Sequence, residues 1–154
     1  MIRLVLESRL AAPPEQVWTA VAAMKGVNAE LHPWVHMTSP RGIDRLDADD
    51  TSLRGGFRSW ILVLGVIPVD RHHFGFDEIG NRHFAERSRS WLNRTWRHNR
   101  TVSTGSDPQT SSIRDELEIV PRIRALRPLV RTVVRAVFRH RHRRLRRAFG
   151  ETAA

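Results

Sequence analysis

The chain of 154 residues contains no cysteine, which excludes disulfide scaffolds, thiolate zinc sites, iron–sulfur clusters and cysteine nucleophiles. Lysine is almost missing too, because Lys25 is the one lysine among 26 basic residues. No apolar run reaches the roughly 18–20 residues that a membrane span needs. The first ten residues alternate too early between apolar and charged side chains for a signal sequence. We therefore expect a soluble, cytoplasmic protein.

Common active-site motifs are also missing. The sequence has no Gly-x-Ser-x-Gly element, no dinucleotide or P-loop glycine pattern and no His-Glu-x-x-His. Histidines do lie close together, for example His32 and His36, but without a carboxylate at a metal-ligand spacing. We expect neither a metal nor a cofactor.

The excess of positive charge is confined to one part of the chain. The net charge of +10 comes entirely from residues 121–154, which hold eleven arginines and Glu151, whereas residues 1–120 are electrically balanced. A charged partner should therefore meet the C-terminal part. A nucleic-acid partner is not favoured, because no helix-turn-helix, zinc finger or aromatic RNA-binding pattern accompanies the arginines.

Hydrophobic periodicity predicts a strand, two short helices, several strands and one long helix. The strands are expected at residues 2–10, 57–67, 71–79, 84–90, 91–103 and 111–120. Pro14 begins the first helix, which should end near Gly26, and residues 28–36 hold a second short helical segment. The last helix runs from Pro128 to Gly150.

This order predicts an α+β helix-grip fold, in which a curved antiparallel sheet wraps around the long C-terminal α-helix, with two short helices after the first strand. Residues 1–150 form one domain, and residues 151–154 are a tail. Because a sheet cannot close completely on one helix, we expect a cavity between them.

The last two strands allow a register to be predicted. If opposed residue numbers sum to 215, His98, Arg100 and Asp115 share the inner row, among mostly apolar neighbours. One interpretation is a structural ion pair with a histidine packed beside it. The other is a polar group that orients a bound apolar molecule.

Candidate site residues follow from this arrangement. The expected ligand-binding residues are Trp60, Phe74, Phe76, Trp96, His98, Arg100, Asp115, Val134 and Phe138. A basic face of the last helix suits an anionic membrane surface. The residues expected to make that contact are Arg139, Arg143, Arg146 and Arg147.

The chain resembles the SRPBCC superfamily, the START-like or helix-grip group that includes polyketide cyclases and lipid-transfer domains. The resemblance rests on the opening strand followed by Ala-Ala-Pro-Pro-Glu-Gln-Val-Trp18, on Trp96-Arg-His98 before a hairpin that carries Asp115, and on Phe138-Arg-His-Arg-His142. It implies a ligand-binding fold and supplies no universal catalytic set.

Three functions remain open at this point. The first is a carrier or sensor that binds a lipid, isoprenoid or polyketide-like molecule between the sheet and the last helix. The second is a cyclase or aromatase with His98 as general acid–base, Arg100 steadying an enolate and Asp115 orienting one of them. The third is a protein that docks on a membrane surface or a partner through the arginine-rich helix.

Overall fold

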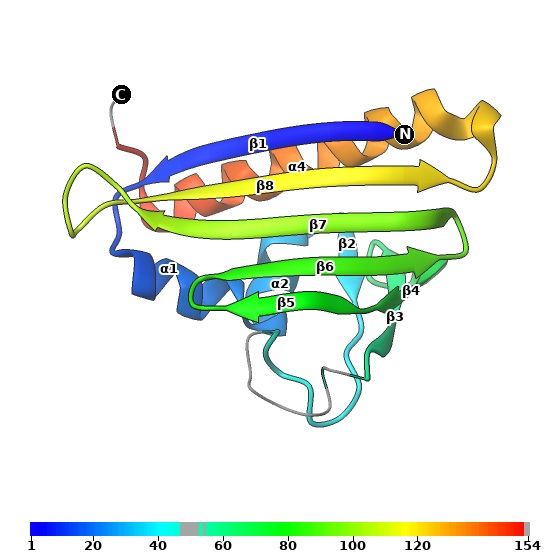
Figure 1. The fold of residues 1–154 in the computed structure, drawn as a ribbon, viewed down its shortest axis with the longest axis horizontal. Helices are drawn as coiled ribbons and strands as arrows, with labels where there is room; N and C mark the ends of the chain where they lie inside the picture. The colour runs from blue at the N-terminus through cyan, green and yellow to red at the C-terminus, as the bar shows by residue number, and fades with distance from the viewer. Residues whose placement is uncertain (47–52, 54, 153–154) are drawn as a thin grey trace.

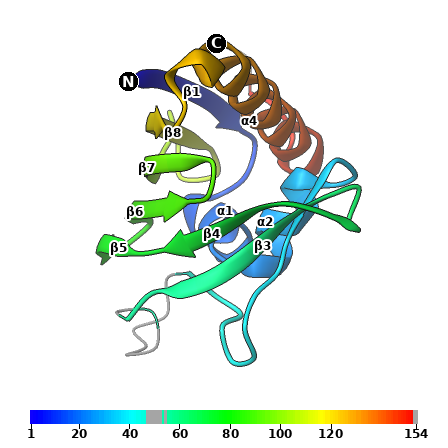
Figure 2. The same cartoon turned by 90° about the vertical axis from the view of Figure 1, so that its right-hand side faces the viewer.

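The computed structural model describes residues 1–46, 53 and 55–152. An antiparallel sheet of eight strands curls partly around the long helix α4 (Arg127–Phe149), as Figures 1 and 2 show. The strands along the sheet are β1 (Ile2–Leu10), β8 (Ser111–Pro121), β7 (Asn93–Thr104), β6 (His83–Ser90), β4 (Ile67–Phe74), β3 (Phe57–Val63) and β2 (Val35–Met37), while β5 (Phe76–Gly80) pairs with β6 off this path. The predicted α+β helix-grip fold is confirmed.

The two short helices are α1 (Pro14–Val21) and α2 (Met24–Leu31). The boundary between them lies earlier in the chain than the sequence predicted. The first helix ends before Gly26, because Ala23 has an extended backbone with ψ 141°. Gly26 lies inside α2 instead. It is needed there because α1 and α2 approach closely, and a Cβ at this position would overlap the Ala20 carbonyl oxygen.

Replacing Gly26 with alanine is expected to lower the free energy of unfolding by roughly 1–3 kcal/mol, because overpacking outweighs the helix propensity gained. Gly55→Ala is the matched control, since no heavy atom lies within 4 Å of a Cβ built there. Urea unfolding of both variants measures the difference. Equal stabilities would show that α1 and α2 can separate without cost.

The apolar segment expected as one strand, 57–67, is a hairpin. Strand β3 ends at Val63, and the turn contains Leu64 and Gly65 with φ of 52° and 74°. Pro68 therefore does not end a strand; it lies inside β4, opposite Leu62, beside a shift in the register. A proline is tolerated at such an irregularity because it removes no regular ladder hydrogen bond.

Helix α4 packs against β1, β8 and α2. Val134, Phe138 and Leu145 are its buried apolar residues. The chain then returns to the first strand, because the amide of Ala11 donates to the carbonyl oxygen of Gly150 at 3.2 Å. Within the described residues, no helix is both long and apolar enough to cross a membrane.

An additional short 3₁₀ helix, η1 (Arg124–Leu126), connects β8 to α4. The β6–β7 turn lies beside this connection, at the right-hand end of Figure 1. Of the tail expected at 151–154, Glu151 pairs with Leu10, while residues 153–154 lie outside the described residues.

Candidate functional site

Strands β7 and β8 have the predicted register. Arg100 lies opposite Asp115, and His98 lies opposite Leu117. Successive side chains of a strand point to opposite faces, so His98, Arg100 and Asp115 all enter the space between the sheet and α4. All three are buried, and Arg100 and Asp115 have no exposed surface at all.

Arg100 is held by two carboxylates. Its Nε and Nη2 donate to Asp115 Oδ1 and Oδ2 at 2.7 and 2.8 Å, and its Nη1 and Nη2 donate to Glu30 Oε1 and Oε2 at 2.9 and 3.0 Å. Burial acts to lower the pKa of Arg100, but Asp115 and Glu30 outweigh it and hold that pKa above its ordinary value. The guanidinium therefore stays charged, and each of its two pairs of N–H donors, its two forks, binds one carboxylate.

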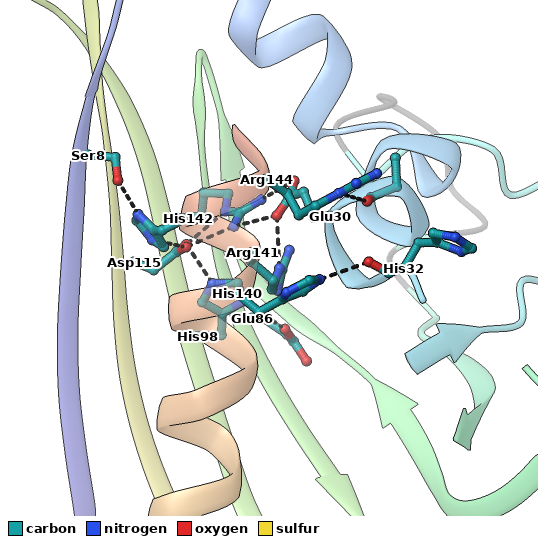
Figure 3. A network of polar contacts seen from close by, with 12 residues as sticks. Ser8, Glu30, His32, Glu86, His98, Asp115, His140, Arg141, His142 and Arg144 are labelled. Carbon is teal, nitrogen blue, oxygen red and sulfur yellow. Dashed lines mark hydrogen bonds and ion pairs between the residues drawn. The ribbon is translucent and has the colours of Figure 1, made fainter. Parts of the chain in front are cut away.

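Helix α4 contributes two further polar residues to the same interior (Figure 3). Arg141 Nε donates to Glu30 Oε2 at 2.8 Å, and His142 Nε2 lies 3.0 Å from Asp115 Oδ2. The other ring nitrogen of His142 lies 2.7 Å from the hydroxyl of Ser8 on β1. These contacts tie β1, α2, β8 and α4 together. We call this connected set, with Arg100, Glu30 and Asp115, the buried ion network.

His98 links the network to a third carboxylate, Glu86 on β6. Its Nε2 lies 2.8 Å from Asp115 Oδ1, and its Nδ1 lies 3.4 Å from Glu86 Oε2. His72 Nε2 approaches the other oxygen of Glu86 at 2.7 Å. Burial acts to raise the pKa of Glu86, but the hydrogen bonds from His72 and His98 outweigh it and lower that pKa to about 2.

Asp115 is the centre of this network, because it accepts hydrogen bonds from Arg100, His98 and His142. Burial acts to raise the pKa of Asp115, and the charge of Arg100 outweighs it and holds that pKa well below its usual range. An ionised carboxylate that is fully buried is tolerated only with such compensation. These contacts fit the first of the two interpretations of the hairpin, a structural ion pair, and contact of His98, Arg100 and Asp115 with a ligand stays a prediction.

Sequence reasoning missed Glu30, Arg141, His142 and Ser8. Two signals were available. Arg141 and His142 interrupt the apolar stripe of α4 between Phe138 and Leu145, at spacings of three and four that face the core. Ser8 likewise occupies the inner parity of β1. Glu30 lies on the buried side of α2 with Val27 and Leu31, but the sequence placed Val27 outside both expected short helices and so hid this pattern.

The predicted ligand-binding aromatics divide into two groups. Phe74, Phe76, Trp96 and Phe138 lie on the inner side, where Phe138 contacts the rings of Trp96 and His98 at centroid distances of 6.4 and 5.2 Å. Phe74 and Phe138 are buried in the core, as is Val134, whereas Phe76 and Trp96 are half-buried. Their contact with a ligand stays a prediction.

Trp60 does not belong to this inner group. Because Ser59 points inward and is fully buried, its neighbour Trp60 lies on the outer face of β3. There its ring packs edge-on against Trp91 at 5.1 Å and under the guanidinium of Arg71 at 5.3 Å. The sequence could not show which face of β3 and β4 is buried, because both faces carry large apolar side chains.

The expected basic face of α4 is partly present. Arg139, Arg143 and Arg147 are exposed. Arg146 is half-buried and turns toward the protein, where it donates to Ser8 Oγ at 2.8 Å and lies 3.5 Å from Glu151. Arg146 thus makes contacts within the protein that the other three do not, and the assignment of these arginines to an anionic surface stays a prediction.

A hollow of about 350 Å³ lies between the C-terminal turns of α4 and the α1–α2 pair. Its lining is mostly small or apolar, with Glu30 and two arginines as the charged groups. The lining residues are Ala20, Val21, Gly26, Ala29, Glu30, Arg144, Leu145, Arg147, Ala148 and Phe149. Glu30 thus belongs both to this hollow and to the buried ion network. In the described part of the chain, no cluster of three or more histidine, aspartate or glutamate side chains is placed to hold a metal ion.

Residues 8–149 match the family described as "Domain of unknown function (DUF8410)". The chain belongs to the DUF8410 family. The match runs from Ser8, near the end of β1, to the end of α4, and so covers every residue of the buried ion network. The sequence of this DUF8410 chain matches no curated protein.

Solved structures share the fold of the DUF8410 chain. The protein XoxI from Bacillus cereus is 13% identical with a TM-score of 0.70, over 97% of this chain and 96% of that one. A START superfamily protein from Mycobacterium smegmatis is 8% identical with a TM-score of 0.66, over 96% of each chain. The Zhui aromatase/cyclase from a Streptomyces species is 13% identical with a TM-score of 0.67, over 94% of this chain and 90% of that one. These likenesses show that the DUF8410 chain has the SRPBCC, START-like fold.

Proposed function

We propose that the chain binds a small apolar molecule in the hollow between α4 and the α1–α2 pair, as a carrier or sensor. The hollow itself carries the proposal. Its volume of about 350 Å³ falls in the range of small-molecule sites, roughly 300–1,000 Å³. Val21, Leu145 and Phe149 supply apolar surface, and three alanines and Gly26 leave space beside it.

The charged groups of the hollow define the ligand further. Glu30 is already compensated, because Arg100 and Arg141 donate to its two oxygens. Arg147 is exposed at the hollow, and the Nε of Arg144 donates to the carbonyl oxygen of Ala29 at 3.2 Å. Arginine therefore provides the available donors. We infer a ligand with an apolar body and one acidic or carbonyl group.

This position differs from the interior between the sheet and α4 where the sequence places a cavity. In that interior the buried ion network joins both sides, and Val134 and Phe138 are packed into the core. Binding beside Trp96 and Phe76, which are half-buried, stays a prediction. The hollow is the better candidate because it needs no displaced ion pair.

The cyclase hypothesis has less support from the geometry. A general acid–base must reach its substrate, and His98 is buried with each ring nitrogen facing a carboxylate. Arg100 has both forks engaged and has none to offer an enolate oxygen. The Ser8, His142 and Asp115 side chains do form a hydrogen-bonded series, but Ser8 is only 5% exposed and accepts a hydrogen bond from Arg146. Binding is therefore favoured over catalysis.

Filling the hollow tests the proposal. Ala148→Trp places an indole on its lining and is expected to weaken binding of lauric acid and of 1-anilinonaphthalene-8-sulfonate at least tenfold, because the apolar ligand loses its space. Ala136→Trp is the matched control, an exposed alanine on the same helix that does not line the hollow. Native mass spectrometry detects the fatty acid, and fluorescence titration follows the dye.

Three results would contradict binding in the hollow. One is that neither probe binds the wild-type protein. The second is that Ala148→Trp binds both probes as tightly as wild type. The third is an equal loss in Ala136→Trp, which would place the ligand elsewhere along α4. Thermal unfolding of both variants checks that each one folds.

A further inference from the structure

Four arginines gather on the outer face of the sheet, where β6 turns into β7. They line a hollow of about 240 Å³, distinct from the one beside α1 and α2. They come from four separate segments, since Arg58 is on β3, Arg71 on β4, Arg89 on β6 and Arg122 follows β8. We call this hollow the arginine pocket. Its full lining is Arg58, Arg71, His73, Arg89, Ser90, Trp91 and Arg122.

The positive charge of the arginine pocket is not compensated. Within the described residues, none of its four guanidinium groups forms an ion pair with a carboxylate. Arg71 Nε is buried without a hydrogen-bond partner, and Arg122 Nε donates only to the carbonyl oxygen of Ser90. The nearby carboxylate of Asp70 is buried and accepts hydrogen bonds from the backbone amides of Arg71 and Leu92. An anion would complete the pocket.

The titration of His73 agrees with this excess of positive charge. Its pKa lies below the ordinary value, first because of burial and then because of repulsion from Arg89, Arg58 and other basic neighbours. Arginine forks also match the oxygen geometry of phosphate. The chemistry of the pocket therefore favours a phosphate group.

Exposed apolar side chains adjoin the arginine pocket. Trp91 lines it and is 59% exposed, and Ile123, next to Arg122 in the chain, is 58% exposed. The amide of Arg122 donates to the carbonyl oxygen of Leu92 at 3.0 Å, which joins the β6–β7 turn to the segment before α4. We call the exposed set the apolar rim. It consists of Trp91, Leu92 and Ile123 beside the pocket, and of Leu126 and Leu129, the exposed leucines that follow Ile123 in η1 and the first turn of α4.

We propose that the arginine pocket and the apolar rim form one docking surface for anionic phospholipid bilayers, with a lipid phosphate in the pocket and the rim among the headgroups. Charge complementarity identifies the occupant, because uncompensated arginines attract an anionic surface. The apolar rim supplies aliphatic side chains and a tryptophan, which insert favourably at the interface of a bilayer.

A single-stranded nucleic acid would also meet arginine and tryptophan here. Base stacking, however, uses aromatic rings and leaves Leu92, Ile123 and Leu129 without a partner. A free phosphate ion would leave the whole rim exposed to water. The bilayer is the occupant that uses both features, and it does so independently of the proposed ligand hollow.

Two double variants with the same loss of charge locate the contact. Arg58→Gln with Arg89→Gln removes two exposed arginines of the pocket, and Arg139→Gln with Arg143→Gln removes two from the basic face of α4. In flotation with phosphatidylcholine vesicles containing phosphatidylglycerol, the pocket variant should bind about 30-fold more weakly at low salt. Each arginine near an anionic surface contributes roughly a factor of five. The α4 variant should bind as the wild type does.

The apolar rim needs its own pair of variants. Ile123→Ser should weaken vesicle binding roughly tenfold, because even partial insertion of an aliphatic side chain contributes about that factor to the affinity. Val5→Ser is the control, since Val5 is similarly exposed at 57% but lies on β1. Vesicles of phosphatidylcholine alone should bind weakly in every case.

Several results would overturn the docking proposal. The first is no flotation of the wild type with anionic vesicles at low salt. The second is a loss in the α4 variant equal to or greater than that in the pocket variant, which would transfer the contact to Arg139 and Arg143. The third is calorimetric binding of inorganic phosphate, or of an oligonucleotide, that the pocket variant abolishes while vesicles do not bind. Intact lauric acid binding in the pocket variant keeps this test separate from that of the ligand hollow.

Discussion

Replacing Arg100 with methionine is expected to lower the free energy of unfolding by about 3–5 kcal/mol, with a fall in Tm of roughly 10 °C or more. Methionine fits the apolar surroundings, but it leaves Asp115 and Glu30 without the guanidinium that both of them bind. Removing one partner of a buried pair costs more than the pair itself contributes, because an uncompensated charge stays in the interior.

The control lies on the same strand. Arg97→Met removes an arginine on the outer, exposed side of β7, and its effect should stay within about 0.5 kcal/mol. The loss of stability in Arg100→Lys should lie between those of the two methionine variants. An ammonium keeps the charge but cannot bind each carboxylate with a pair of N–H donors. Urea unfolding at pH 7 gives the three values. A loss below 1 kcal/mol in Arg100→Met would show that the buried ion network does not hold the fold together.

The hairpin register was predictable from the sequence, because period-two alternation in two adjacent strands fixes which residues face each other. That register placed Arg100 opposite Asp115 and His98 opposite Leu117, as the structure has them. What alternation cannot show is which residues from other elements complete a buried site. Glu30 comes from α2, 70 positions from Arg100, and its role depends on how the helices pack on the sheet.

The prediction of one strand at 57–67 was wrong for a different reason. An apolar run with both parities filled indicated one covered strand, yet Gly65 divides it into a hairpin that leaves Val66 74% exposed. The run is apolar on its outer face as well, as Trp60 shows. Apolar residues on a solvent-facing surface imitate a buried strand, and period alone cannot separate the two.

The two proposed sites lie at opposite ends of α4. The ligand hollow is beside its last turns, and the apolar rim includes Leu129 in its first turn. A helix of 23 residues spans about 35 Å at roughly 1.5 Å per residue. The buried ion network fastens the segment between them through Arg141 and His142. Substitutions at one end should therefore leave the other end unchanged, which allows the two assays to be read separately.

Acid should destabilise the fold through Glu86. Its pKa falls from an ordinary 4.5 to about 2 in the folded protein, because the hydrogen bonds from His72 and His98 outweigh burial. The folded state therefore binds fewer protons than the unfolded chain between these two values, and stability decreases as the pH is lowered through that interval. The contribution is fully present above pH 4.5 and amounts to about 3 kcal/mol.

Glu86→Gln removes this titration. The variant should be less stable than wild type at pH 7 but should lose about 3 kcal/mol less between pH 5 and pH 2. Glu78→Gln is the matched control, since Glu78 pairs with His83 at 3.0 Å on the surface and is 66% exposed. Asp115, whose pKa is also depressed, is present in all three proteins and contributes to the loss that they share. Urea unfolding across this pH range measures the difference, and parallel curves for wild type and Glu86→Gln would show that Glu86 does not titrate with folding.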